Sequence, residues 1–184
     1  YVKIGLYEKA EKFLKKSYEI NPNALDLIVN LLSALYFNKK FEEAVKIAES
    51  AIKQHTTNYE LFYNLSLCYY EIKEYQKGVE VINKSLSLMS SDSDGYADAL
   101  VAKGAHLMRL VRNDEAIETL MEALKINNDH LGAFKNLSDC YNHISDHRAS
   151  VLFNRLAYGV IEFEEKTNDI DLSLIRIEKV PLKQ

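Results

Sequence analysis

Proline and glycine are scarce in this sequence, which has 184 residues but only two prolines, six glycines and no tryptophan. So few helix-breaking residues predict long helices joined by short turns. The composition, 47% hydrophobic and 27% charged, excludes a disordered or collagen-like chain, because there is ample apolar side chain to bury. No apolar run reaches the roughly 18 residues of a membrane-spanning helix. We therefore expect an all-α chain without membrane insertion.

Cysteine and net charge limit the compartment and the partners. The only cysteines are Cys68 and Cys140, which cannot build a disulfide framework and so indicate a cytoplasmic or other intracellular reducing compartment. No signal-peptide pattern follows Tyr1, which agrees with that compartment. The net charge of −4, from 27 acidic and 23 basic residues, argues against a nucleic-acid partner.

The sequence contains an internal repeat. Small residues recur at steps of 34, 34, 38 and 34 positions, at Ala10, Ala44, Gly78, Ala116 and Ser150. A second column keeps the same phase, at Leu35, Tyr69, Leu107 and Tyr141. On both sides of a charged break, such as residues 38–40, apolar residues follow helical spacing. Each unit of the repeat is therefore predicted to be a helix, a turn and a second helix, with the small residue where the two helices come closest.

This pattern resembles the tetratricopeptide repeat, a family of helix pairs about 34 residues long. The best single match runs from Phe62 through Asn64 to Tyr69, while Gly104 and Pro22 each supply the family's glycine and proline once. The resemblance implies an all-α fold, a right-handed superhelical solenoid of antiparallel helix pairs. It divides the chain into the second half of an incomplete repeat at 1–24, four repeats at 25–58, 59–96, 97–130 and 131–164, and a capping or linker tail at 165–184.

Two segments depart from the repeat. Residues 90–95 account for four extra residues in the second full repeat, and Asp92 and Asp94 alternate there as in a calcium-binding loop. A glutamate is missing where the bidentate ligand of such a loop belongs, so we expect a lengthened loop with a Ser or Asp helix cap. In the tail, apolar and polar residues alternate from Ile170 onward, which is typical of a strand. The spacing of Ile170, Leu174 and Ile177 is also typical of a short helix. Both alternatives remain open.

Motifs for catalysis are missing from the sequence, which has no Gly-rich phosphate loop, no Cys-x-x-Cys and no Gly-x-Ser-x-Gly. Cys68 and Cys140 occupy the same place in two repeats, and Ala34 and His106 hold that place in the others. We interpret both cysteines as small residues packed inside a helix pair rather than as nucleophiles.

Four residues near the end of the repeats have the spacing of metal ligands: Asp139, Cys140, His143 and His147. Residues four apart share a helix face, but the repeat places a turn between the two histidines, which spoils this geometry. We therefore expect no metal site, no cofactor and no enzymatic activity.

The resemblance also implies that the first helix of each pair lines a concave groove, where an Asn before the motif Leu often binds the backbone of a ligand. Rigid tyrosines beside aliphatic residues and carboxylates suit a peptide or helix of a partner protein. The predicted groove residues are Asn30, Ser33, Tyr36, Phe37, Glu60, Tyr63, Asn64, Leu67, Tyr70, Asp98, Met108 and Asn136. Packing between repeats also buries residues of the first helices. The alternative is therefore that some of these aromatic residues belong to the core.

Chaperone adaptors of this family bind a C-terminal carboxylate through inward Lys, Arg and Asn residues. Here Glu60 and Asp98 place negative charge where a Lys would serve, and Ala102 replaces the Arg, so this activity is not expected. The sequence predicts a scaffold that binds another protein, as a subunit or fragment of a larger assembly. The alternative is a sensing or targeting region of a larger enzyme whose catalytic domain lies outside this chain.

The incomplete first repeat leads to one more expectation. Tyr1 falls within a repeat that is already broken, so we expect the chain to be part of a longer protein. Without a preceding helix, Leu6, Phe13 and Leu14 are expected to be exposed and to favour self-association.

Overall fold

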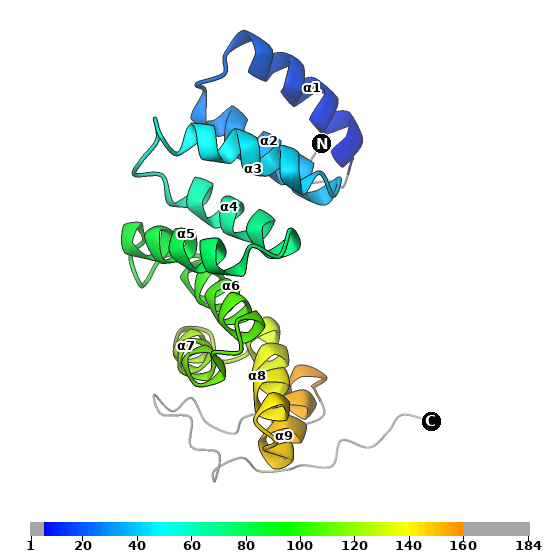
Figure 1. Ribbon diagram of the computed structural model, residues 1–184, viewed down its shortest axis with the longest axis vertical. Coiled ribbons are helices and arrows are strands. Elements are labelled where there is room, and N and C mark those ends of the chain that lie inside the picture. Colours follow the sequence, from blue (N-terminus) through cyan, green and yellow to red (C-terminus); the bar gives the residue numbers. More distant parts are fainter. Residues whose placement is uncertain (1–5, 160–184) are drawn as a thin grey trace. The chain divides into compact units, whose positions relative to one another are not determined.

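The computed structural model describes residues 6–159, and within that range it contains nine α-helices and no strand (Figure 1). These residues divide into two compact units, which we call the N-terminal unit, up to Ser90, and the C-terminal unit, from Ser91. The prediction of an all-α fold built from helix pairs is confirmed. The predicted tail at 165–184 and the last residues of the fourth repeat lie outside the described residues.

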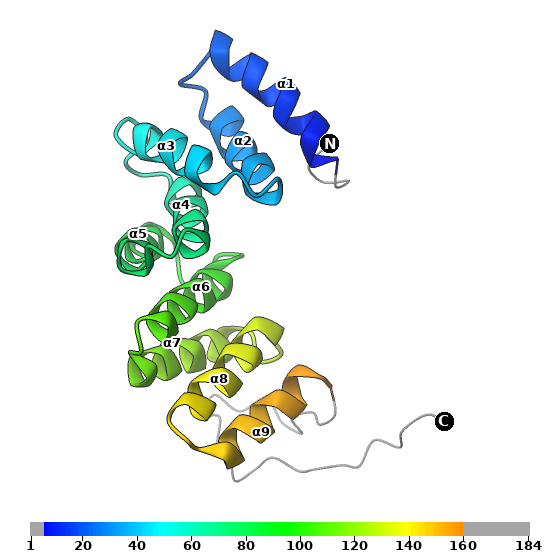
Figure 2. The ribbon, with the colours of Figure 1, turned by 45° about the vertical axis from the view of Figure 1, so that its right-hand side comes forward.

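The N-terminal unit consists of helices joined by short turns: α1 (Tyr7–Ile20), α2 (Leu25–Phe37), α3 (Phe41–Ala51), α4 (Tyr59–Glu71) and α5 (Tyr75–Leu88). Each helix packs against the next one along the chain, and α2 also packs against α4. Successive helices run in opposite directions (Figure 2). The first helices of two predicted repeats, α2 and α4, are thereby neighbours.

The C-terminal unit has the same arrangement in α6 (Tyr96–Arg109), α7 (Asn113–Ile126), α8 (Leu131–His143) and α9 (His147–Ala157). Consecutive helices pack together, and α6 also packs against α8. The prediction of a Ser or Asp at the N-cap of α6 is wrong, because the N-cap residue is Gly95, which has no side chain. Gly95 has a φ of 89°, a left-handed conformation that glycine adopts without strain.

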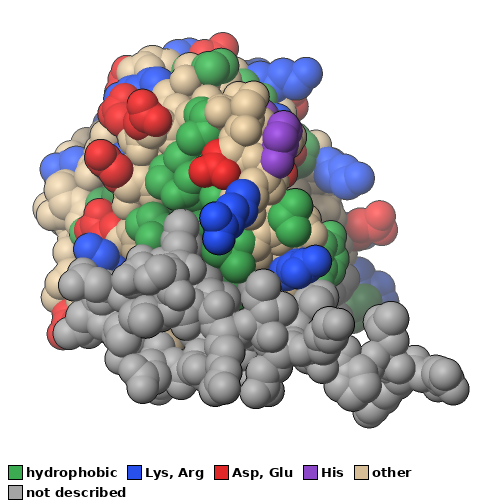
Figure 3. Space-filling view, turned by 90° about the horizontal axis from the view of Figure 1, so that it is seen from below, with side chains coloured by type: hydrophobic (Ala, Val, Ile, Leu, Met, Phe, Trp, Pro, Cys, Tyr) green, Lys and Arg blue, Asp and Glu red, His purple; other side chains and the backbone are tan. Residues whose placement is uncertain are grey.

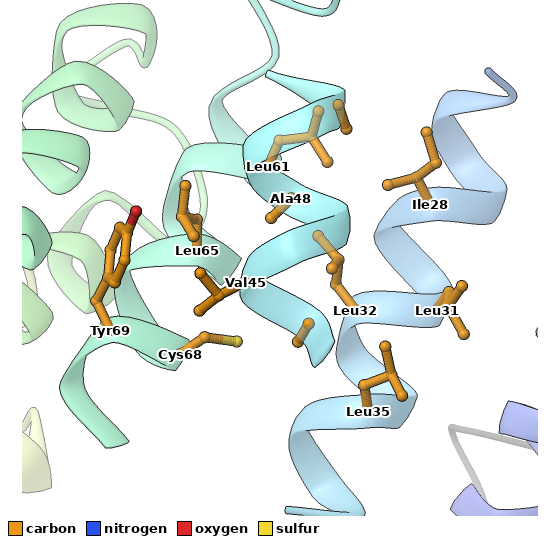
Figure 4. Packing of buried hydrophobic residues seen from close by; sticks show 12 residues of the cluster. Ile28, Leu31, Leu32, Leu35, Val45, Ala48, Leu61, Leu65, Cys68 and Tyr69 are labelled. Carbon is orange, nitrogen blue, oxygen red and sulfur yellow. The ribbon is translucent and has the colours of Figure 1, made fainter. Parts of the chain in front are cut away.

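The core of the N-terminal unit lies between α2, α3 and α4. Figure 4 shows Ile28 and Leu32 of α2 directed toward α3, and Val45 of α3 directed toward Leu65 of α4. The predicted small residues Ala44, Gly78 and Ala116 are buried. In the α6–α7 pair, a Cβ atom on Gly104 would lie 2.7 Å from Cγ of Leu120. This distance is below van der Waals contact, so the close approach of α6 and α7 requires glycine at this position.

The four turns inside the helix pairs share one backbone conformation. Lys39, Lys73, Val111 and Ser145 all have a φ between 59° and 65°. In the α6–α7 turn, the N–H of Val111 donates to the carbonyl of Met108 at 3.0 Å, and the N–H of Arg112 donates to the carbonyl of Leu107 at 3.0 Å. This pair of bonds is a Schellman motif, in which the left-handed residue is usually glycine. Val111 is the least suited of the four, because a β-branched side chain is strained at positive φ.

Replacing Val111 with glycine should stabilise the chain by about 0.5–1 kcal/mol, because relief of backbone strain exceeds the entropy that glycine adds to the unfolded chain. Val111 is 76% exposed, so little burial is lost. Urea denaturation measures the change. The control is Val151→Gly, at a half-exposed helical position, which should destabilise the chain. A lower stability of Val111→Gly would show that the turn is not strained.

A buried carboxylate joins α1 to the turn between α2 and α3. Glu11 is only 6% exposed and accepts hydrogen bonds from Asn38 Nδ2 and Lys40 Nζ, both at 2.6 Å. Lys15 Nζ lies 2.8 Å from Glu11 and 2.6 Å from Glu43 of α3. Burial by itself would raise the pKa of Glu11, but the hydrogen bonds from Lys15, Lys40 and Asn38 outweigh it and lower the pKa to about 2.

The Glu11→Gln variant should be less stable than the wild type by about 1–3 kcal/mol at neutral pH, because it loses charged hydrogen bonds. The folded pKa of Glu11, about 2, lies below the ordinary value of 4.5. Its contribution is therefore complete above pH 4.5 and is lost as the pH falls toward 2. Denaturation of both proteins between these pH values should show the difference shrinking. A difference that stays constant would contradict this account of Glu11.

The outer face of α1 carries apolar residues. Leu6, Phe13 and Ile20 are exposed, and their spacing of seven positions places them on one side of the helix. The expectation that Leu14 is also exposed is wrong, because Leu14 turns inward and packs against the buried cluster of the N-terminal unit.

Candidate partner-binding surface

Two neighbouring helices of the N-terminal unit carry most of the predicted groove residues. On α2 these are Asn30, Ser33, Tyr36 and Phe37, and on α4 they are Glu60, Tyr63, Asn64, Leu67 and Tyr70. We call these nine residues, together with Glu71, the α2–α4 surface. Asn30, Phe37, Glu60 and Glu71 are exposed and the others are half-buried, so none of the ten is fully buried.

The hydroxyl of Tyr36 joins the two helices by donating a hydrogen bond to Glu71 Oε1 at 3.1 Å. Its ring meets the rings of Phe37 and Phe41 edge-on, with centroids 5.7 Å and 5.4 Å away. Burial and then the charge of Glu71 raise the pKa of Tyr36 to about 12. The phenol therefore remains a hydrogen-bond donor at neutral pH and holds the end of α2 against the end of α4.

Phe37 is held in place although its side chain is 53% exposed. Its ring stacks on Tyr7 of α1, with centroids 4.2 Å apart. Stacking on one face and exposure on the other leave a rigid apolar surface for contact.

The asparagines predicted to bind a ligand's backbone differ in their surroundings. The amide of Asn30 donates to the backbone oxygen of Asp26 at 2.6 Å, so part of its capacity is used within α2. Ser33 likewise donates to the backbone oxygen of Val29 at 3.1 Å. The half-buried side chain of Asn64 forms no hydrogen bond within the described residues. Of these three side chains, Asn64 is the one that makes no such bond to its own helix.

The other predicted groove residues belong to the C-terminal unit. Asp98 Oδ1 lies 2.9 Å from His130 Nε2, and Asn136 is half-buried. Met108 is only 4% exposed, so its prediction as a partner contact is wrong: it is a core residue. Figure 3, a view from below, shows charged side chains of both signs among apolar ones on the described part of that face. The tyrosine-rich character of the α2–α4 surface is not repeated at the corresponding positions of α6 and α8.

The column that holds both cysteines is buried in every repeat, at Ala34, Cys68, His106 and Cys140. Burial, together with the charge of Glu71, raises the pKa of the Cys68 thiol to about 12. Burial likewise raises the pKa of Cys140, to about 11. Both thiols are therefore protonated at neutral pH, which agrees with a packing role rather than a nucleophilic one.

The histidines considered as metal ligands are separated by a turn, since α8 ends at His143 and α9 begins at His147. Within residues 6–159, no group of three or more His, Cys, Asp or Glu side chains is arranged to hold a metal ion. The same part of the chain has no helix of the length and apolar character needed to cross a membrane.

Glu71 is the one member of the α2–α4 surface that is not among the predicted groove residues. It lies one repeat length after Phe37, so the repeat spacing could have identified it as a surface residue. Its hydrogen bond with Tyr36 depends on the packing of two helices and is not visible in the sequence.

Comparison with known proteins gives relatives of modest identity. A human protein named Protein O-mannosyl-transferase TMTC1 is 25% identical over 137 residues, which cover 74% of this chain and 16% of the relative. Hsp70-Hsp90 organizing protein 3 of Arabidopsis thaliana is 27% identical over 123 residues, which cover 67% of this chain and 21% of the relative. The chain thus spans less than a quarter of the length of these relatives.

Solved structures of MamA are similar in fold. One matches with a TM-score of 0.72 and 20% identity, over 85% of this chain and 90% of MamA. MamA from Desulfovibrio magneticus RS-1 matches with a TM-score of 0.73 and 16% identity, over 85% of this chain and 86% of that one. The sequence profile described as tetratricopeptide repeat matches residues 1–24, 59–91 and 97–130. Together with the helix pairs in phase, this match shows that the chain belongs to the tetratricopeptide repeat family.

Proposed function

We infer that the chain is a protein-interaction scaffold whose α2–α4 surface binds a peptide or helix of a partner protein. The observation that carries this proposal is the set of partly exposed aromatic side chains on two neighbouring helices, namely Tyr36, Phe37, Tyr63 and Tyr70. Aromatic residues of this kind contribute much of the binding energy in protein interfaces. The proposal assigns no catalysis and no cofactor to the chain.

Rigidity of the surface supports the proposal. Tyr36 is bonded to Glu71 and Phe37 is stacked on Tyr7, so these side chains lose little freedom when a partner binds. A partner segment would place apolar side chains over Tyr63 and present backbone groups to the amide of Asn64.

Replacing Tyr63 with alanine should weaken binding by about 2 kcal/mol if Tyr63 is a central anchor, and Asn64→Ala by about 1–2 kcal/mol. A peptide selected from a display library against the whole chain serves as the probe, and calorimetric titration gives the affinity. Tyr158, an exposed tyrosine of the C-terminal unit, supplies the control variant Tyr158→Ala, which should bind normally. If both α4 variants are folded and bind as tightly as the wild type, the proposal fails.

The exposed apolar side of α1 supports a second interaction, between two copies of this chain. Phe13 is 59% exposed and Ile20 is 85% exposed, and both lie on the same side as Leu6. Burying this stripe against a second copy would remove apolar surface from water.

Light scattering should therefore show a mass above that of the monomer, rising with protein concentration. Phe13→Lys should shift the equilibrium to the monomer by placing a charge in the contact, whereas Tyr158→Lys should not. A clean monomer of the wild type at high concentration would rule out this contact.

The alternative function is that of a sensing or targeting region of a larger enzyme. It gains support from the relative named as a transferase, because the match covers only 16% of that relative's length. A catalytic domain encoded in the same reading frame would favour it, and the absence of such a domain would favour the scaffold. A cytoplasmic or otherwise reducing compartment suits both functions, because Cys68 and Cys140 are free and buried.

A further inference from the structure

The α2–α4 surface carries negative charge without a basic residue to balance it. Glu60 is exposed in the first turn of α4 and Glu71 is exposed at its last residue, while Asp26 is exposed in the first turn of α2. Within the described residues, none of these three carboxylates takes part in an ion pair. By contrast, Glu115 of α7 lies 2.6 Å from Arg112.

The carboxylate of Glu71 has a fixed place beside the aromatic rings. Its Oε1 atom accepts the hydrogen bond from Tyr36 at 3.1 Å, while Oε2 takes part in no hydrogen bond within the described residues. Because the phenol of Tyr36 stays protonated at neutral pH, this bond orients the carboxylate and leaves one oxygen for a partner's donor.

A basic side chain fits these features best. A cation within about 6 Å of a tyrosine ring is attracted to the ring face, and a guanidinium group can also stack on it. The same guanidinium donates hydrogen bonds to a carboxylate at its edge. An acidic partner residue would instead be repelled by whichever of Asp26, Glu60 and Glu71 it approached.

We propose that the partner segment bound by the α2–α4 surface carries arginine or lysine next to an apolar residue, with Glu60 and Glu71 as the acceptors of the basic groups. This proposal rests on the proposed function, because it names the chemistry of the partner for the same surface. It is specific to the N-terminal unit, since in the C-terminal unit Asp98 already lies against His130 and Lys135 adds positive charge on α8.

The test uses a library of random 12-residue peptides, selected for binding to the whole chain at low salt. The variant Glu60→Gln/Glu71→Gln removes two charges but keeps the shape of both side chains, and the amide oxygen introduced at position 71 can still accept the hydrogen bond of Tyr36. The control Glu42→Gln/Glu118→Gln removes the same charge from exposed positions on α3 and α7, away from the surface. Circular dichroism checks that every variant is folded.

The proposal expects selected peptides enriched in Arg and Lys, whose affinity falls roughly tenfold in the double variant and not in the control. The effect should fade at high salt, since screening weakens exposed ion pairs. Peptides that depend on Tyr63 but are acidic, or are unaffected by the double variant, would overturn this inference and leave the scaffold function standing. If no selected peptide depends on Tyr63, both proposals fail.

Discussion

The close approach of two helices at one small residue per repeat is the constraint on which the rest of the structure depends. Ala44 and Ala116 are completely buried at this position. In the α6–α7 pair, Gly104 of the first helix adds a second close approach, because a Cβ atom there would collide with Leu120. A larger residue at these places would force the helices apart and expose the leucines between them. The turns are equally regular, because a residue with left-handed backbone conformation occurs at the turn of all four helix pairs.

This packing leaves one side of each first helix outside the core, and on α2 and α4 that side carries the residues proposed to bind a partner. On α2 and α4 the buried stripes are filled by residues such as Leu31 and Leu65, while Tyr63 and Tyr70 stay half-buried outside the core cluster. Tyr36 instead joins the two helices through Glu71 and stays half-exposed. A rigid aromatic surface with unbalanced carboxylates is thus a consequence of how the pairs stack.

The helix pairs and the buried columns could be predicted from the sequence because residues at the same repeat position occupy the same environment several times. The column of Ala34, Cys68, His106 and Cys140 is buried throughout, as its small residues indicate. Met108 shows the limit: it shares a repeat position with Tyr36 and Tyr70, yet it alone is buried. A flexible thioether side chain can fill a core gap without a hydrogen-bond partner, whereas a phenol buried at the same position would need one for its hydroxyl. The bond between Tyr36 and Glu71 depends likewise on two helices meeting, which spacing alone does not specify.

The central claim, that partners bind the first helices rather than the outer ones, is tested most directly by hydrogen–deuterium exchange of the whole chain with and without a bound peptide. Amides report local opening, and binding slows exchange where it stabilises the backbone. The account predicts slower exchange in α2 and α4, with α3 and α5 little changed. Protection confined to α3, α5 or the loop around Asp92 would contradict it.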